Sequence, residues 1–162
     1  MHAALLHMRA QESDHIINVT SAVGKVSMAA FGWDAATKHA IEALSDALHN
    51  EVKQFGIKVT LIEPRLIDTE FLELQAEQLK NTLHPPAYHR VIDGVPKALP
   101  GKSAEPSSIG KAVVDAAGSN SPPVRHALPA DAKAALLVRR YLVTRASCDG
   151  IFDWGVRRMM GL

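Results

Sequence analysis

The chain has 162 residues, which suits one domain, and its 47% hydrophobic and 22% charged residues are typical of a globular protein. The formal net charge of +1 excludes the strongly basic composition of a nucleic-acid-binding protein. A single cysteine, Cys148, excludes an intrachain disulfide and is typical of a reducing compartment. The sequence shows neither a membrane-spanning apolar run nor a secretory leader pattern, so we expect a cytoplasmic protein.

The first half of the chain alternates helices and strands. Residues 3–10 favour a short helix, and residues 15–21 form a β-branched run of strand length. Residues 34–55 are the clearest helix, because apolar side chains recur there at spacings of three and four. Gly56 follows as the helix-ending residue, and residues 57–62 form a second strand. The predicted apolar stripe of the long helix consists of Ile41, Leu44, Leu48, Val52 and Phe55.

Strand, helix and strand in this order predict a right-handed βαβ unit with parallel strands. Ligand-binding groups gather at the carboxyl ends of such strands. This rule places Thr20, Ser21 and residues 63–69 on the functional rim.

Signals are weaker in the second half. Residues 71–108 contain a short helix over residues 71–79 and then an irregular stretch with the character of a substrate loop. A helix over residues 108–117 and a last strand over residues 124–128 complete the sheet. The inward positions of that helix are Ile109, Ala112, Val113 and Ala116.

The tail from residue 125 onward is locally basic, with seven cations against three anions. Helices are expected there over residues 131–142 and 151–160. Such a tail suits either an amphipathic membrane or partner surface or ordinary solvated helix faces, and the lack of a dense Lys/Arg cluster favours the solvated faces.

Together these elements predict an α/β fold, a partial Rossmann-like doubly wound arrangement with a small parallel sheet of about three strands flanked by helices. We expect residues 1–162 to form a single domain.

Three motifs carry a family resemblance. Residues 18–24 read N-V-T-S-A-V-G, residues 36–44 read A-T-K-H-A-I-E-A-L, and residues 55–64 read F-G-I-K-V-T-L-I-E-P. In their order and spacing they resemble the short-chain dehydrogenase/reductase family. The resemblance covers nearly the whole chain and implies an oxidoreductase that uses NAD or NADP on alcohol or carbonyl substrates.

The resemblance also implies site residues. Ser21 and Lys38 match the family's catalytic serine and lysine, and the tyrosine position, thirteen residues after the serine and four before the lysine, is occupied by Asp34. A carboxylic acid is already ionised at neutral pH, so Asp34 cannot donate a proton to a carbonyl group as a tyrosine would. We therefore expect catalytic impairment.

The cofactor positions implied by the resemblance are Lys38 and the loop residues Pro64, Ile67 and Thr69, which match positions facing the nicotinamide ribose and carboxamide. The family's glycine after the proline is replaced by Arg65. The family's glycine-rich phosphate turn does not occur, so the sequence resembles the second half of a member, and we expect weak or absent NAD(P) binding by this chain alone.

A missing first half would leave the strand of residues 15–21 at an open sheet edge, so we expect a homo-oligomer or a complementary partner chain. In the resembling family the helix matching residues 34–55 also belongs to the helix pair that often builds dimers.

Alternatives remain open from the sequence. The chain can be a non-catalytic interaction module on the same scaffold, with Asp34 and Lys38 forming a helical ion pair and Ser21 capping a turn. A serine hydrolase using Ser21 with Asp34 and a histidine such as His39 is a minor alternative, because no nucleophile-elbow motif surrounds the serine.

No metal site is expected, because His84 and His89 lack partners at ligand spacing. Arg65 can clamp an anion at the rim, but the interpretation we favour is an exposed side chain that fills the place of the lost glycine.

Overall fold

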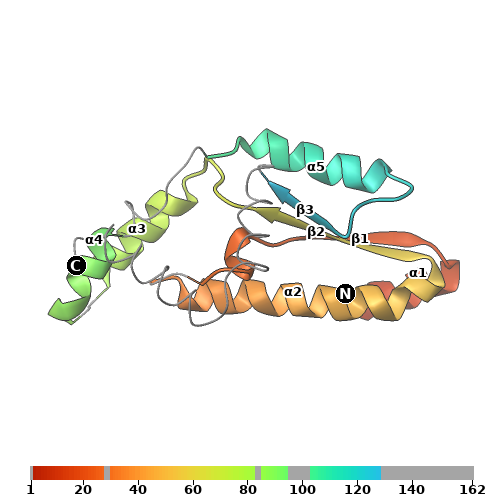
Figure 1. Cartoon of the computed structure of the whole chain (residues 1–162), viewed down its shortest axis with the longest axis horizontal. Coiled ribbons are helices and arrows are strands. Elements are labelled where there is room, and N and C mark those ends of the chain that lie inside the picture. Colours follow the sequence, from red (N-terminus) through yellow and green to blue (C-terminus); the bar gives the residue numbers. More distant parts are fainter. Residues whose placement is uncertain (1, 28–29, 83–84, 95–102, 129–162) are drawn as a thin grey trace, which may run out of the picture.

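The computed structural model describes residues 2–27, 30–82, 85–94 and 103–128, so the helices predicted over residues 131–142 and 151–160 lie outside the described residues. The sheet lies between α5 on one face and α1 and α2 on the other (Figure 1). In chain order the elements are α1 (His2–Gln11), β1 (Asp14–Val19), the 3-10 turn η1 (Ala22–Gly24), α2 (Gly32–Val52), η2 (Lys53–Phe55), β2 (Ile57–Pro64), α3 (Phe71–Asn81), η3 (Pro86–Tyr88), α4 (His89–Gly94), α5 (Pro106–Gly118) and β3 (Arg125–Leu128).

The three strands form one parallel sheet in the order β1-β2-β3. Asp14 is paired with Ile57 at the start of the first ladder, and Leu61 with Arg125 at the start of the second. This arrangement confirms the predicted α/β fold with a small parallel sheet flanked by helices. It also places β1 at an edge of the sheet formed by the described residues.

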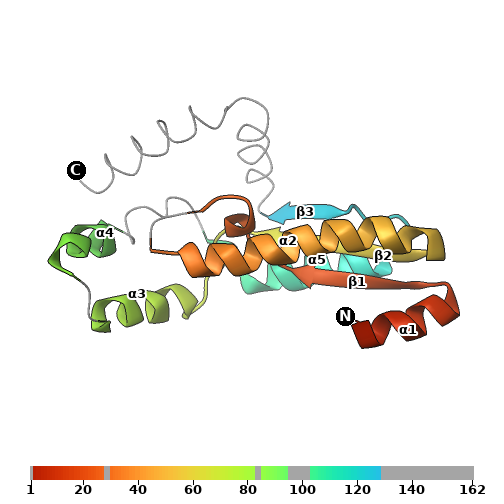
Figure 2. The ribbon, with the colours of Figure 1, turned by 90° about the horizontal axis from the view of Figure 1, so that it is seen from below.

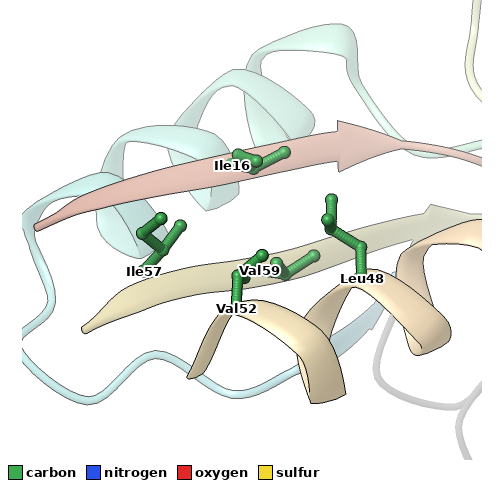
Figure 3. Close-up of a cluster of buried hydrophobic side chains, with 5 residues drawn as sticks. All are labelled: Ile16, Leu48, Val52, Ile57 and Val59. Carbon is green, nitrogen blue, oxygen red and sulfur yellow. The ribbon is translucent and has the colours of Figure 1, made fainter. Parts of the chain in front are cut away.

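One half of the core lies between the sheet and α2. Apolar side chains of β1 and β2 face those of α2 (Figure 3). Leu5 and Met8 of α1 pack against this cluster partly buried. The buried members are Ile16, Leu48, Val52, Ile57 and Val59. Burial of these side chains, each worth about 1.5–3 kcal/mol, fixes α2 against the sheet.

The other half of the core lies under α5. Ile109, Ala112 and Ala116 are buried against Ile62 of β2, and Val113 packs against them partly buried. These are the inward positions that the sequence predicted for this helix. Small alanines at two of them let the helix approach the sheet closely.

The predicted apolar stripe of α2 is only partly correct. Leu48 and Val52 are buried, but Leu44 is 52% exposed. The face that α2 turns to the sheet instead contains Glu42 and Ser45, both buried. Polar side chains displace the predicted leucine because their hydrogen-bonding partners lie on the strands beneath them.

Gly56 ends the long helical segment as predicted, with a left-handed φ of +70°. A Cβ at this position would lie 2.6 Å from the carbonyl oxygen of Glu12, so a larger residue meets both backbone strain and a clash.

Helices α3 and α4 extend beyond the carboxyl ends of the strands in both views (Figures 1 and 2). The sequence predicted only one short helix in this segment, whereas η3 and α4 also form there. Among the described residues, no helix combines the length and the apolar character needed to cross a lipid bilayer.

Candidate functional site

A pocket of about 300 Å³ opens at the carboxyl ends of β1 and β2. Its walls come from the turn after β1, the first turns of α2, the loop after β2 and the start of α3. It is lined by Thr20, Ser21, Val23, Phe31, Asp34, Lys38, Pro64, Arg65, Leu66, Ile67, Thr69 and Phe71. The structure therefore brings together the site residues implied by the family resemblance, which are Ser21, Asp34, Lys38, Pro64, Ile67 and Thr69, although they derive from three separate segments.

Ser21 lies directly after β1. Its hydroxyl donates to the carbonyl oxygen of Pro64 and accepts from the backbone N–H of Val23, both at 3.3 Å. The second bond caps the turn η1, so the turn-capping role considered from the sequence is present. Both bonds are long, which leaves the hydroxyl able to exchange them for a bond to a ligand.

Asp34 and Lys38 lie one helical turn apart in α2, and both are half-buried in the pocket wall. No ion pair joins them or links either to another described residue. The ion pair considered from the sequence is thus not formed. Neighbouring Trp33 is 89% exposed and lines a second hollow of about 260 Å³ between the start of α2 and α3.

The loop after β2 is fixed on both sides. The backbone N–H of Arg65 donates to the carbonyl oxygen of Leu128 at 2.8 Å, and the N–H of Asp68 donates to that of Ala104 at 2.9 Å. Ile67 forms an isolated parallel bridge with Ala104. Backbone pairing therefore holds the Pro64–Thr69 wall in place, and Ile67 also packs against the core cluster under α5.

Behind the pocket lies a buried charge cluster that the sequence analysis missed, consisting of Lys25, Glu42, Glu63 and Arg125. Both glutamates are only 3% exposed. One guanidinium nitrogen of Arg125 contacts Glu42 and lies 2.6 Å from Glu63, while its other terminal nitrogen contacts Asp46. The ammonium of Lys25 lies 2.7 Å from Glu42 and 3.9 Å from Glu63.

The two glutamates have opposite pKa shifts. Burial alone would raise the pKa of Glu42, but hydrogen bonds from Lys25, Thr20 and Arg125 outweigh it and hold the pKa below its ordinary value. Burial, together with the neighbouring charge of Glu42, raises the pKa of Glu63 against the opposing effect of Arg125 and Lys25. Because Glu42 has more donors, it keeps its charge and Glu63 takes up a proton first.

The cluster connects three walls of the pocket. Thr20, next to Ser21, donates to Glu42 at 2.6 Å, so the turn carrying Ser21 is tied to the helix carrying Asp34 and Lys38. Gly24 supports this approach, because a Cβ there would lie 3.0 Å from Glu42 Cγ.

Two sequence signals could have revealed the cluster. Glu42 follows Lys38 by four residues, on one face of the helix, and Glu63 directly follows the apolar pair Leu61 and Ile62 near the end of β2. Charged residues in such positions are buried only when they are paired. The partner Arg125 is 62 residues from Glu63 in the sequence, and no local pattern points to it.

The residues present fit one end of a dinucleotide cofactor. Lys38, Pro64, Ile67 and Thr69 share the pocket wall, as binding of a nicotinamide ribose there would require. The sequence contains no glycine-rich phosphate turn. It therefore lacks the motif with which the family holds the pyrophosphate at a helix N-terminus.

Other chemistries find less support. No histidine is among the residues that line the pocket in the described part of the chain, and His39 Nδ1 donates to the carbonyl oxygen of Ala35 at 2.8 Å. Among the described residues no group of three or more His, Cys, Asp or Glu could hold a metal ion. His84 lies outside the described residues.

Comparison with known proteins agrees with the fold. The sequence model of the family described as short chain dehydrogenase matches residues 1–80. The chain is 38% identical over 79 residues to 17-beta-hydroxysteroid dehydrogenase type 6 of Mus musculus, an alignment that covers 48% of this chain and 25% of that enzyme.

Solved structures extend the similarity beyond residue 80. A short-chain dehydrogenase from Streptomyces avermitilis has a TM-score of 0.69 and 30% identity, with 92% of this chain and 53% of that chain covered. A short chain dehydrogenase from Burkholderia cenocepacia, solved in complex with NADP, has a TM-score of 0.60 and 16% identity, with 92% and 51% covered.

These matches show that this chain is similar to short-chain dehydrogenases and has a Rossmann-like fold. The chain spans about half the length of these two solved relatives.

Proposed function

We propose that this chain forms the substrate-side half of an NAD(P)-dependent oxidoreductase that acts on small alcohols or carbonyl compounds. The observation that carries the proposal is the pocket that gathers Ser21, Asp34, Lys38 and the Pro64–Thr69 loop at the carboxyl ends of parallel strands. Ligands bind at this end in open α/β sheets, and the residues match the family positions at which substrate and nicotinamide meet.

The residues of this chain would act by binding and orientation. The Ser21 hydroxyl can donate to a substrate oxygen, and Lys38 can bind a ribose hydroxyl or stabilise negative charge. The bound cofactor would supply or accept the hydride. Asp34 occupies the place of the family's tyrosine, and its shorter side chain lacks the phenol hydroxyl that exchanges the proton there, so we propose a slow or inactive enzyme.

Cofactor affinity tests the proposal. Because this chain offers only the nicotinamide end of the site, we expect NADH and NADPH to bind no more tightly than about millimolar, or about −4 kcal/mol, by titration calorimetry. Micromolar binding by the chain alone would contradict the proposal of an incomplete cofactor site.

A repair experiment tests the catalytic assignment. The Asp34→Tyr variant alone should not reduce a test ketone, because the hydride donor remains unbound. The same variant fused to the nucleotide-binding half of a homologous dehydrogenase should gain activity, while the fusion carrying Asp34 should stay slower by on the order of a hundredfold or more. Equal rates for the two fusions would remove the role assigned to position 34.

A non-catalytic interaction module is the second candidate, and the open edge of β1 favours it. The exposed Val19 of this strand and Leu44 on the outward face of α2 are 47% and 52% exposed. Unpaired strand edges and exposed apolar side chains promote association. We therefore propose a homo-oligomer or a complementary chain, and a monodisperse monomer by light scattering at micromolar concentration would contradict it.

A further inference from the structure

Arg65 occupies an unusual place in the pocket. It follows Pro64 at the carboxyl end of β2, and its backbone N–H is fixed to Leu128. Its side chain lines the pocket and is half-buried, so it is not the exposed filler that the sequence favoured. The buried Nε of Arg65 has no hydrogen-bond partner among the described residues. The guanidinium is therefore positioned at the pocket without being committed to an internal acceptor.

Lys38 is a second cation in the same wall. In the described part of the chain neither cation forms an ion pair, because the acids behind the pocket, Glu42 and Glu63, are engaged by Lys25 and Arg125. Among the described residues that line this pocket, Asp34 is the only acid. With two cations and one carboxylate, this described lining has a formal charge of +1.

The rest of the described lining is mostly apolar: beside the hydroxyl side chains of Thr20, Ser21 and Thr69 it consists of Val23, Phe31, Pro64, Leu66, Ile67 and Phe71. Pockets for small molecules combine such a wall with a few polar groups that orient the ligand. The volume of about 300 Å³ is at the lower end of the range for such pockets, so the ligand must be small.

We propose that Arg65, with Lys38, forms an anion subsite and that the pocket takes a small organic carboxylate with an apolar body, such as an oxo acid or hydroxy acid. The planar guanidinium binds a carboxylate through two parallel hydrogen bonds, and the apolar wall receives the rest of the molecule. A lining charge of +1 suits a monoanion. A phosphate dianion would be repelled more strongly by Asp34. That the acid is a substrate rests on the proposed function, whereas binding of the acid at Arg65 does not depend on it.

The experiment compares 4-methyl-2-oxopentanoate with its neutral methyl ester by ligand-observed NMR titration. We expect the acid to bind at least about tenfold more tightly than the ester, because hydrogen bonds to charged groups are the stronger ones. Arg65→Gln should weaken binding of the acid by about tenfold to a hundredfold and leave binding of the ester unchanged. Arg65→Lys keeps the charge without the planar fork and should recover part of the loss.

Lys111→Gln is the matched control. This variant also removes one cation, but Lys111 is exposed on α5 and pairs only with Asp115, so binding of the acid should not change. Unfolding midpoints of all variants confirm folding. If Arg65→Gln fails to fold, two measurements still test the proposal. They are the comparison of acid with ester on the unaltered chain and the binding of the acid by Arg65→Lys.

Several results would overturn the proposal: no binding of the acid, equal binding of acid and ester, or equal effects of Arg65→Gln and Lys111→Gln. Binding of inorganic phosphate or nicotinamide mononucleotide that depends on Arg65, without such binding of the acid, would also overturn it in favour of a phosphate site.

The proposed function fails separately. Acid binding that depends on Arg65, together with an inactive repaired fusion, supports the subsite and contradicts the oxidoreductase. A fusion that reduces neutral ketones and oxo acids alike, with no effect of Arg65→Gln, supports the oxidoreductase and contradicts the anion subsite.

Discussion

Replacing Arg125 by methionine should strongly destabilise the fold. The guanidinium contacts Glu42 and Glu63, whose side chains are each only 4% exposed, so its removal leaves two buried carboxylates that share a single remaining cation, Lys25. Removing one partner of a buried ion pair costs about 3–5 kcal/mol. Because Lys25 still lies 2.7 Å from Glu42, we expect a value near about 3 kcal/mol, a large fraction of typical domain stability.

Urea denaturation followed by circular dichroism measures this loss against two reference variants. Thr20→Val removes one donor at 2.6 Å from a buried carboxylate and should cost about 1.5–3 kcal/mol. Lys111→Gln removes an exposed pair, with side chains 75% and 55% accessible, and should cost at most about 0.5 kcal/mol. The expected order is Arg125→Met, then Thr20→Val, then Lys111→Gln.

A double-mutant cycle separates the charge effect from lost packing. Adding Glu63→Gln to Arg125→Met removes one of the unpaired charges, so the double variant should be more stable than the sum of the two single effects predicts. Additive effects, or an Arg125→Met cost no larger than that of Lys111→Gln, would refute the reasoning. If Arg125→Met does not fold, Arg125→Lys, which keeps one charge, should fold with an intermediate loss.

The opposite pKa shifts of the two buried glutamates predict opposite pH dependences. The lowered pKa of Glu42 stabilises the fold at pH values above the pKa of this group in the unfolded chain, and this stabilisation is lost as pH falls. In urea titrations, Glu42→Gln should therefore become more destabilising, relative to the unaltered chain, as pH rises from 3 to about 5. The raised pKa of Glu63 stabilises the fold at pH values below the pKa of this group in the unfolded chain, and this stabilisation is lost as pH rises. Glu63→Gln should therefore become less destabilising over pH 4 to about 7. If the destabilisation by the two variants changed with pH in the same direction, the opposite pKa shifts would be contradicted. Gly56→Ala should lower the free energy of unfolding by more than about 1 kcal/mol, because φ is +70° and the new Cβ would lie 2.6 Å from Glu12. The matched change Gly110→Ala, inside α5 with nothing within 4 Å, should raise it by about 0.5–1 kcal/mol, and equal effects in thermal unfolding would show that backbone conformation at Gly56 is unimportant.

The sequence by itself determined the elements and their order. Apolar spacing located α2 and α5, β-branched runs located β1 and β2, and Gly56 marked the helix end. These signals are local, because a turn or a helical face depends on residues within a few positions of one another. The motifs that carry the family resemblance are equally local, so the resemblance implied that Ser21, Asp34 and Lys38 belong to one site, and all three line the pocket.

Only the tertiary structure decided which polar residues are buried. Residues 42, 63 and 125 are far apart in the chain, and a charge is buried favourably only where its partner arrives from another element. The same reason explains Leu44, which periodicity placed in the core: α2 turns Glu42 and Ser45 toward the sheet because their partners lie there, and the leucine faces outward. The sequence favoured an exposed Arg65 for the same reason, since the backbone of its loop is fixed by Leu128 and Ala104, which are distant in the chain.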